Sequence, residues 1–121
     1  MNSLVFDWQA RRFTEVHVNF FILESLRLPE LDDAAFAALA RAGARLSCPD
    51  ERFADFAAAT GVEHGPLADV ERLELRAEID ARTARAWELT DAELELVFED
   101  FTLNAVPGDY RDTVRDRFRE L

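Results

Sequence analysis

The sequence predicts a mainly α-helical fold, a small helical bundle with a short residual β segment near the N-terminus. Apolar residues recur at spacings of three and four along most of the chain after Pro29, as in amphipathic helices. Capping residues and Gly or Pro breaks separate these periodic stretches. The 121 residues, 49% of them hydrophobic and 32% charged, suffice for one modest globular core.

The first thirty residues contain the one region where we expect β structure. Residues 2–12 mix apolar and polar residues at helical spacing and predict a short amphipathic helix. Residues 13–18 alternate in hydrophobicity and predict a short strand. Residues 20–28 fit either state, because Asn19 can cap a helical turn whereas Pro29 favours an extended chain just before it.

Two helices are predicted upstream of a linker at 61–66, which contains Gly and Pro. Asp32 or Asp33 opens the first helix, Ser47 caps the second, and Gly61 ends it. The apolar face predicted for the first helix consists of Phe36, Leu39, Ala40, Gly43 and Leu46. The inner side predicted for the second helix consists of Phe53, Phe56 and Ala57.

The longest helix is predicted at 68–87, with one polar residue in an otherwise apolar seam. The seam consists of Val70, Leu73, Ala77, Asp80, Ala84 and Trp87. A second stripe through Leu75 and Ile79 predicts that this helix contacts neighbours on two sides. Asp80 is expected to pair with a neighbouring arginine or a backbone group, because a carboxylate inside a core needs a partner.

The last two helices follow a capping box and a chain break. Thr90 and Glu93 have the spacing at which each side chain caps the other's backbone N–H. The apolar stripe that follows consists of Leu94, Val97, Phe98 and Phe101. After Pro107, Asp109 is predicted to cap a final helix. That helix is expected to bury Val114 and Phe118.

The charge of the chain is strongly and unevenly acidic. All fourteen basic residues are arginine, against twenty-five acids, so the net charge is −11. Residues 1–48 hold five arginines and six acids, whereas 49–121 hold nine arginines and nineteen acids. DNA-binding surfaces are usually basic, because phosphate contacts supply much of the affinity. Any nucleic-acid surface is therefore expected near Arg11 and Arg12, with the acidic remainder facing solvent or protein.

The sequence lacks the motifs of several kinds of catalytic and binding site. His17, Cys48 and His64 lack the close spacing of a metal site. There is no Gly-rich phosphate loop, nucleophile elbow or His-Glu-x-x-His motif. The longest apolar run, at 20–23, is far too short to span a bilayer, and no secretory signal is evident. We expect a protein of the reducing cytoplasm that has no membrane partner.

Three blocks of sequence resemble a known family. Residues 2–12 read Asn-Ser-Leu-Val-Phe-Asp-Trp-Gln-Ala-Arg-Arg, and 17–29 read His-Val-Asn-Phe-Phe-Ile-Leu-Glu-Ser-Leu-Arg-Leu-Pro. Residues 76–94 continue with Arg-Ala-Glu-Ile-Asp-Ala and, later, Trp-Glu-Leu-Thr-Asp-Ala-Glu-Leu. In this order and spacing the blocks resemble the C-terminal part of large adenine-specific DNA methyltransferases of restriction–modification and related phage-defence systems. The resemblance extends to Phe98-Glu-Asp-Phe and Tyr110-Arg and so spans nearly the whole chain.

The resemblance implies a division into two regions. Residues 1–30 would be the end of a target-recognition region of mixed α/β structure, and 31–121 a C-terminal helical domain. The chain departs from the family pattern at Trp87-Glu88-Leu89, where a glycine is common, and at Thr14-Glu15-Val16 before the His-x-Asn block. The family's S-adenosylmethionine fold and Asn-Pro-Pro-Tyr loop are absent, and Met1 stands inside a motif block, as expected for a truncated frame, split gene or excised fragment.

The function implied is to support target recognition in a site-specific methyltransferase. The catalytic loop holds the extruded adenine and the methyl donor is S-adenosylmethionine, so this chain alone is expected to be inactive and to bind no cofactor. Its partners would be the upstream methyltransferase and recognition domain, DNA in the context of the full enzyme, and other copies of the fragment through an uncovered apolar face. The sites predicted are DNA contacts at Arg11, Arg12 and His17, with no catalytic, cofactor or metal residues.

Other interpretations stay open. Asn19 can serve as a local cap, and the aromatic residues Trp8, Phe20, Phe21 and Trp87 can belong to the core. The chain as a whole can be a small acidic helical module that docks on a protein partner. An anti-restriction DNA mimic is suggested by the net charge of −11. The fourteen interspersed arginines weigh against it, because a mimic needs a continuous negative potential.

Overall fold

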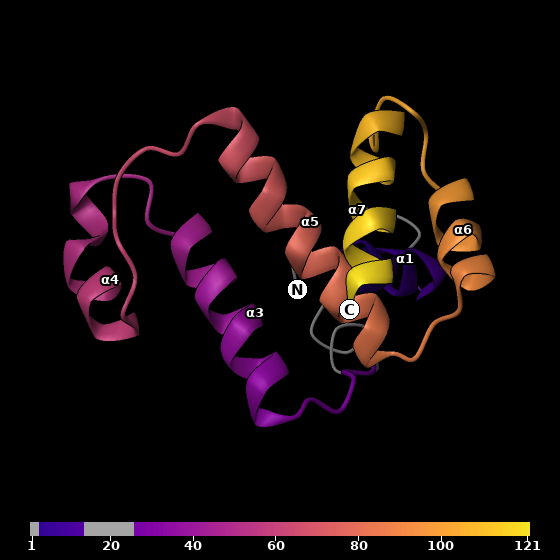
Figure 1. Ribbon diagram of the computed structural model, residues 1–121, viewed down its shortest axis with the longest axis horizontal. Coiled ribbons are helices and arrows are strands. Elements are labelled where there is room, and N and C mark those ends of the chain that lie inside the picture. Colours follow the sequence, from indigo (N-terminus) through magenta and orange to yellow (C-terminus); the bar gives the residue numbers. More distant parts are fainter. Residues whose placement is uncertain (1–2, 14–25) are drawn as a thin grey trace.

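The computed structural model describes residues 3–13 and 26–121, and 69% of these residues are helical (Figure 1). The mainly α fold is therefore confirmed. The elements are α1 (Leu4–Phe13), α3 (Asp33–Leu46), the 3-10 turn η1 (Glu51–Phe53), α4 (Ala54–Thr60), α5 (Asp69–Ala86), α6 (Asp91–Glu99) and α7 (Gly108–Glu120).

The predicted β segment is not seen. No strand occurs in the described residues, and Phe13, the first residue of the predicted strand, ends α1. The continuous helical spacing from residue 4 onward outweighs the short alternation that had suggested a strand there. The rest of that stretch, 14–18, and most of the ambiguous stretch 20–28 lie outside the described residues.

Helix α5 is the central element of the fold (Figure 1). Helix α7 packs along one side of it, and α1 and α6 complete that half of the molecule. Helix α3 packs on the other side of α5, and α4 lies beyond α3 as an outer arm. The prediction that the longest helix contacts neighbours on two sides is thus confirmed.

The core lies between α1, α5, α6 and α7. Its buried members are Val5, Ala77, Ala81, Ala84, Leu94, Val97, Phe98, Phe101, Val106, Tyr110, Val114 and Phe118. The predicted stripes of the last two helices are all among them. The side chains of Trp8 and Trp87 pack against this core and are partly buried. Because Val5 belongs to the same cluster, the first helix is part of the C-terminal core rather than a separate layer.

The alanines of α5 allow close helix packing on both sides. Ala77, Ala81 and Ala84 are fully buried. Small side chains let neighbouring backbones approach, so little space remains to be filled by larger residues. The seam prediction is wrong for the first turns, where Val70 and Leu73 are exposed, because no described element covers that end of the helix.

The capping box at the start of α6 is confirmed. The Glu93 N–H donates to the Thr90 hydroxyl at 3.2 Å, and the Glu93 carboxylate accepts from the Thr90 N–H at 2.7 Å. Two backbone donors that the helix leaves without partners are thereby satisfied. The box places the buried stripe of α6 directly against α7.

We predict that Thr90→Ala lowers the free energy of unfolding by about 1 kcal/mol, because Ala cannot accept the Glu93 N–H. Urea unfolding followed by circular dichroism measures this difference. Thr90→Ser is the matched control, since it keeps the accepting oxygen and should remain close to wild type. Equal stability of the alanine and serine variants would contradict the role given to the cap.

Helix α3 begins as predicted, and its predicted apolar face is only partly turned inward. Its N-cap is Asp32, whose carboxylate accepts from the Ala35 N–H at 2.7 Å. Leu39, Gly43 and Leu46 are partly buried as predicted. The prediction is wrong for Phe36, which is 63% exposed, and for Ala40, while Ala42 is buried. Small side chains on the face toward α5 permit a closer approach than Phe36 would allow.

The predicted start of the second helix is also wrong. Ser47 is the C-cap of α3, and Asp50 caps η1 by accepting from the Arg52 N–H at 2.9 Å. Phe53 and Phe56 are exposed rather than internal, and Ala57 alone of the three predicted residues is buried. Helix α4 has only seven residues and packs mainly on α3 and η1, so the two Phe side chains of this segment are only partly covered in the described structure.

The chain breaks predicted around these helices are confirmed, with one shift. Gly61 ends α4 in the left-handed conformation at φ 72°, which glycine adopts without steric cost. Helix α7 starts after Pro107, two residues earlier than predicted, and Asp109 lies inside its first turn. A carboxylate in the first turn still stabilises the helix through the helix dipole.

Candidate functional site

The two arginines predicted to contact DNA lie on the exposed face of α1, and each has an acidic partner. Arg11 forms an ion pair with Asp7 one turn earlier, at 3.2 Å. Arg12 forms an ion pair with Asp100 at the end of α6. The Trp8 indole N–H donates to the same Asp100 carboxylate.

Both guanidinium groups also lie over aromatic rings. The Arg11 carbon Cζ is 4.8 Å from the centre of the Phe101 ring, and that of Arg12 is 4.6 Å from the Trp8 ring. The two side chains are therefore held by acids and aromatic faces of the chain itself. The structure brings Arg11 and Arg12 together on one helix. The third predicted contact, His17, lies outside the described residues, as do Asn19, Phe20 and Phe21.

A buried carboxylate lies at the junction of α1, α5 and α7. Asp80 is 4% exposed. Its Oδ1 accepts from the Leu4 N–H at 2.7 Å, and its Oδ2 accepts from the Tyr110 hydroxyl at 2.5 Å. The prediction that Asp80 pairs with a backbone group is confirmed. Tyr110 was not predicted as a partner, although a single polar residue in an apolar seam was a signal that one must exist.

The ionisation of this pair is shifted by its surroundings. Burial raises the pKa of Asp80 to about 6, and the hydrogen bonds from Tyr110 and Leu4 oppose that rise. Burial and the adjacent Asp80 charge raise the pKa of the Tyr110 hydroxyl well above its ordinary value. Tyr110 therefore stays protonated and acts as a donor throughout the accessible pH range.

A pocket of about 440 Å³ opens beside this pair, between α1, α5 and the α6–α7 loop. Its polar lining includes Arg11, Arg76, Asp7 and Asp109, so two cations face two anions. Arg76 lies over the Tyr110 ring, with Cζ 5.4 Å from its centre. This balance of charge gives the pocket no strong preference for an anion or a cation.

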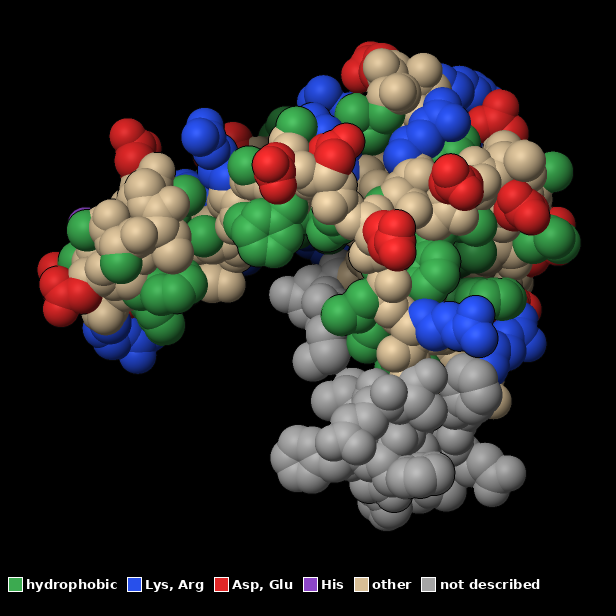
Figure 2. Space-filling model, turned by 90° about the horizontal axis from the view of Figure 1, so that it is seen from below, with side chains coloured by type: hydrophobic (Ala, Val, Ile, Leu, Met, Phe, Trp, Pro, Cys, Tyr) green, Lys and Arg blue, Asp and Glu red, His purple; other side chains and the backbone are tan. Residues whose placement is uncertain are grey.

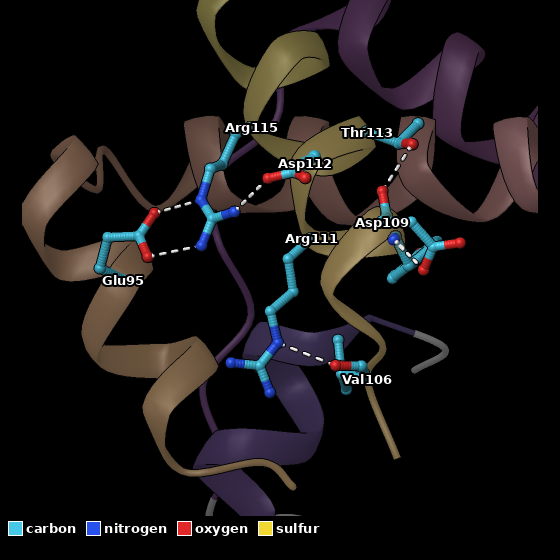
Figure 3. Close-up of polar contacts among 8 residues, drawn as sticks. Glu95, Val106, Asp109, Arg111, Asp112, Thr113 and Arg115 are labelled. Carbon is cyan, nitrogen blue, oxygen red and sulfur yellow. Dashed lines mark hydrogen bonds and ion pairs between the residues drawn. The ribbon is translucent and has the colours of Figure 1, made fainter. Parts of the chain in front are cut away.

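The arginines of α7 stabilise the packing of α6 (Figure 3). Arg115 binds both carboxylate oxygens of Glu95, at 2.5 and 2.8 Å, and also Asp112 at 2.6 Å. Arg111 donates to the Val106 carbonyl at 2.8 Å, as Figure 3 shows. The contact with Arg115 lowers the pKa of Glu95. Both arginines thus stabilise the packing of α7, Arg115 through two carboxylates and Arg111 through backbone carbonyls.

Acidic and basic side chains are intermixed on the face seen in Figure 2. The ion pairs of Arg82 with Glu78 and of Arg117 with Glu74 interrupt the acidic surface of α5. Such alternation is unlike the continuous negative surface of a DNA mimic. The observation argues against that alternative on the described part of the surface.

Large apolar side chains are exposed on the outer arm and elsewhere. On the arm, η1 and α4, they are Phe53 and Phe56. Phe36 of α3 and Val70 and Leu73 at the start of α5 are exposed as well. Hydrophobic side chains are visible on the surface of the projecting arm in Figure 2. Exposed apolar patches mark protein–protein contact sites, and Phe53 and Phe56 of the arm are the candidate residues for such a contact.

Within the described residues, no group of three or more His, Cys, Asp or Glu side chains is placed to hold a metal ion. Cys48 is fully buried and His64 is exposed, so they do not form a shared site. No helix in residues 3–13 and 26–121 is both long enough and apolar enough for a membrane span. Comparison with protein-family models, curated proteins and solved structures gives no match for this chain.

Proposed function

We propose that this chain is a non-catalytic docking module, the C-terminal part of a site-specific adenine DNA methyltransferase of the restriction–modification type. Its task is to hold a target-recognition region against the methyltransferase core. The enzyme's S-adenosylmethionine site and catalytic loop belong to the partner. The basis for the family is the order of the sequence blocks at 2–12, 17–29 and 76–94.

The observation that carries the docking role is the apolar surface of the outer arm. Phe53 and Phe56 are 37% and 49% exposed, although the same chain buries the aromatic residues of α6 and α7. Full burial of a Phe side chain is worth roughly 1.5–3 kcal/mol, so a partner that covers the exposed part of each ring would recover about half of this or less. The arm therefore favours a contact with protein.

The charges around these rings specify the chemistry of the partner. Asp50, Glu51 and Asp55 lie beside Phe53 and Phe56 in the sequence and outnumber the one cation there, Arg52, which pairs with Asp50 at 2.8 Å. The whole chain carries a net charge of −11. A complementary surface has an apolar centre and a cationic rim. The DNA-facing side of a methyltransferase core supplies cations of this kind, because it must bind phosphate.

DNA contact by Arg11 and Arg12 is a secondary part of the proposal. Both guanidinium groups are more than half exposed, so phosphate can reach them. Contact requires each arginine to exchange its carboxylate partner for a phosphate, which weakens binding by this chain alone. In the full enzyme the recognition region would supply the remaining phosphate contacts.

The test uses the protein encoded immediately upstream, provided it carries an Asn-Pro-Pro-Tyr loop. We predict a one-to-one complex of that protein with this chain, measured by size-exclusion chromatography with light scattering. Phe53→Asp with Phe56→Asp should weaken the complex at least tenfold, because each change buries a charge at the interface.

Purified alone, this chain should neither bind S-adenosylmethionine nor methylate DNA.

The matched control is Ala58→Asp with Ala59→Asp, which adds the same two charges at other exposed positions of α4. It should leave the complex nearly unchanged, and circular dichroism of all variants should match wild type. Two results would overturn the proposed origin from a methyltransferase. One is methyl transfer by the isolated chain, and the other is an upstream DNA region that encodes no methyltransferase. A complex that tolerates both Phe substitutions would overturn the role of the arm.

A further inference from the structure

The last turn of α1 lies beside the end of α6, and charged side chains are exposed there on both helices (Figure 1). Trp8 and Arg12, one turn apart on α1, both donate an N–H to Oδ2 of Asp100. The Arg12 guanidinium lies over the Trp8 ring, so the two donors are stacked and reach the same oxygen. Arg11 lies over the ring of Phe101, the residue that follows Asp100. One carboxylate therefore accepts from an indole and a guanidinium, with a second guanidinium nearby.

These groups line a surface pocket of about 350 Å³. Its described lining consists of Trp8, Arg11, Arg12 and Asp100. The guanidinium groups are more than half exposed, and the Asp100 side chain is 42% exposed. Two cations thus face one anion in the pocket lining, while Asp7 pairs with Arg11 from one turn earlier. The pocket has room for a phosphate group, and its N–H donors can be reached from solvent.

The position of Asp100 is unfavourable for α6 itself. Asp100 is the C-cap of that helix, and no basic residue lies in its last turn. The C-terminal end of a helix has a partial negative charge, so a carboxylate there is repelled. Glu99 precedes it and adds to the same negative charge. In the described structure Asp100 is stabilised by the donors of α1, and an exposed ion pair of this kind is weak enough to exchange.

We propose that Trp8, Arg11 and Arg12 form a phosphate-binding site, which Asp100 closes as an internal competitor. Guanidinium groups bind carboxylate and phosphate oxygens with the same N–H donors. A phosphate oxygen can accept from Trp8 and Arg12 at the point where Oδ2 of Asp100 accepts in the closed site. The Asp100 carboxylate then turns away, because two anions on one set of donors repel each other.

The phosphate can come from a DNA backbone or from a free phosphate ion. The inference deepens the DNA contact of the proposed function and rests on it for the choice of DNA. The net charge of −11 opposes the approach of DNA to this chain alone. A closed site rejects weak phosphate ligands and opens where the recognition region already holds the DNA strand. The competitor thereby limits phosphate contacts of α1 to the assembled enzyme.

Titration of the full chain with inorganic phosphate at low salt tests the site, followed by the indole ¹H–¹⁵N signal of Trp8. Asp100→Asn removes the charge but keeps an oxygen that can accept from Trp8 and Arg12. This variant should bind phosphate about fivefold more tightly than the wild type, because competition and charge repulsion are both removed. Trp87 lies outside the pocket lining, so its indole signal should not move, and Trp87→Phe assigns the two signals.

The matched control is Glu99→Gln. It removes the same charge one residue away, from a side chain that is exposed and is not the acceptor of the Trp8 and Arg12 donors. Its affinity for phosphate should stay close to that of the wild type. Adding Arg12→Gln to Asp100→Asn should abolish the gain. Circular dichroism checks that each variant is folded, and Asp100→Ser, which also keeps an accepting oxygen, replaces an Asn variant that does not fold.

Three results overturn the inference. They are equal gains in Asp100→Asn and Glu99→Gln, a gain that survives the loss of Arg12, and a Trp8 signal that phosphate shifts in none of the variants. The same titration with a DNA duplex of about one helical turn identifies the source of the phosphate. Binding of inorganic phosphate without binding of the duplex supports the site and overturns DNA as its ligand. The docking role is tested separately, because the complex with the upstream protein is measured without phosphate or DNA.

Discussion

Replacing Phe98 by alanine will lower the free energy of unfolding by about 3–5 kcal/mol, the largest loss we expect from a single truncation in this chain. Phe98 is 1% exposed and lies at the centre of the α5–α6–α7 core. Arg111 and Arg115 lie over its ring, with Cζ 5.6 and 5.2 Å from the ring centre. Truncation therefore leaves a cavity and also removes the surface on which two α7 arginines rest.

Urea unfolding at neutral pH measures this loss, and Leu96→Ala is the control on the same helix. Leu96 is 58% exposed, so its truncation should change stability by no more than about 0.5 kcal/mol. A Phe98→Ala variant that loses less than about 1 kcal/mol would mean that the core does not close as described. Hydrogen exchange in α7 would then show whether that helix still packs on α6.

Tyr110→Phe is expected to have the second largest effect, and its size should depend on pH. At pH 8 the change removes a donor from a buried ionised carboxylate, at a cost of about 2–3 kcal/mol. At pH 5 Asp80 is mostly neutral, and the loss should be only about 1 kcal/mol. The same unfolding measurement at the two pH values gives both numbers.

The sign of this dependence follows from the raised pKa of Asp80, about 6. A group with a raised pKa in the folded state contributes most stability below its ordinary pKa, and loses that contribution as the pH rises through the folded value. Removing the Tyr110 donor raises this pKa further, so the penalty grows above pH 6. In an Asp80→Asn background the effect of Tyr110→Phe should become independent of pH. A constant loss in both backgrounds would contradict a coupling through the Asp80 charge.

The core and the outer arm have opposite characters. Helices α1, α5, α6 and α7 enclose aromatic side chains and satisfy the polar groups between them. The 3-10 turn η1 and helix α4 together bury one alanine, Ala57, and leave Phe53 and Phe56 exposed. Stability is therefore expected to depend on the core, and binding on the arm. Substitutions on the two parts should have effects that are nearly additive.

The elements that could be predicted from sequence are those with a local cause. The Thr90–Glu93 box, the Asp32 cap and the Gly61 end each depend on contacts within about four residues. The apolar stripe of α6 could also be predicted from its own sequence, because four large apolar residues at helical spacing define only one face that can be buried. Sequence alone likewise showed that the basic residues are all arginine and that the excess acid lies in the second part of the chain.

Tertiary structure decided the rest, because those features depend on residues far apart in the sequence. Which face of α3 turns inward was decided by how closely its alanines approach α5, and Phe36 was left outside. The charge of Arg12 suggested a phosphate contact, but Asp100, 88 residues away, is its partner in the fold. The periodicity of α5 marked Asp80 as exceptional, and only the docking of α1 and α7 supplied its donors. A pattern along one helix specifies which face is apolar, whereas the packed partner determines whether a face is covered and which charges are compensated.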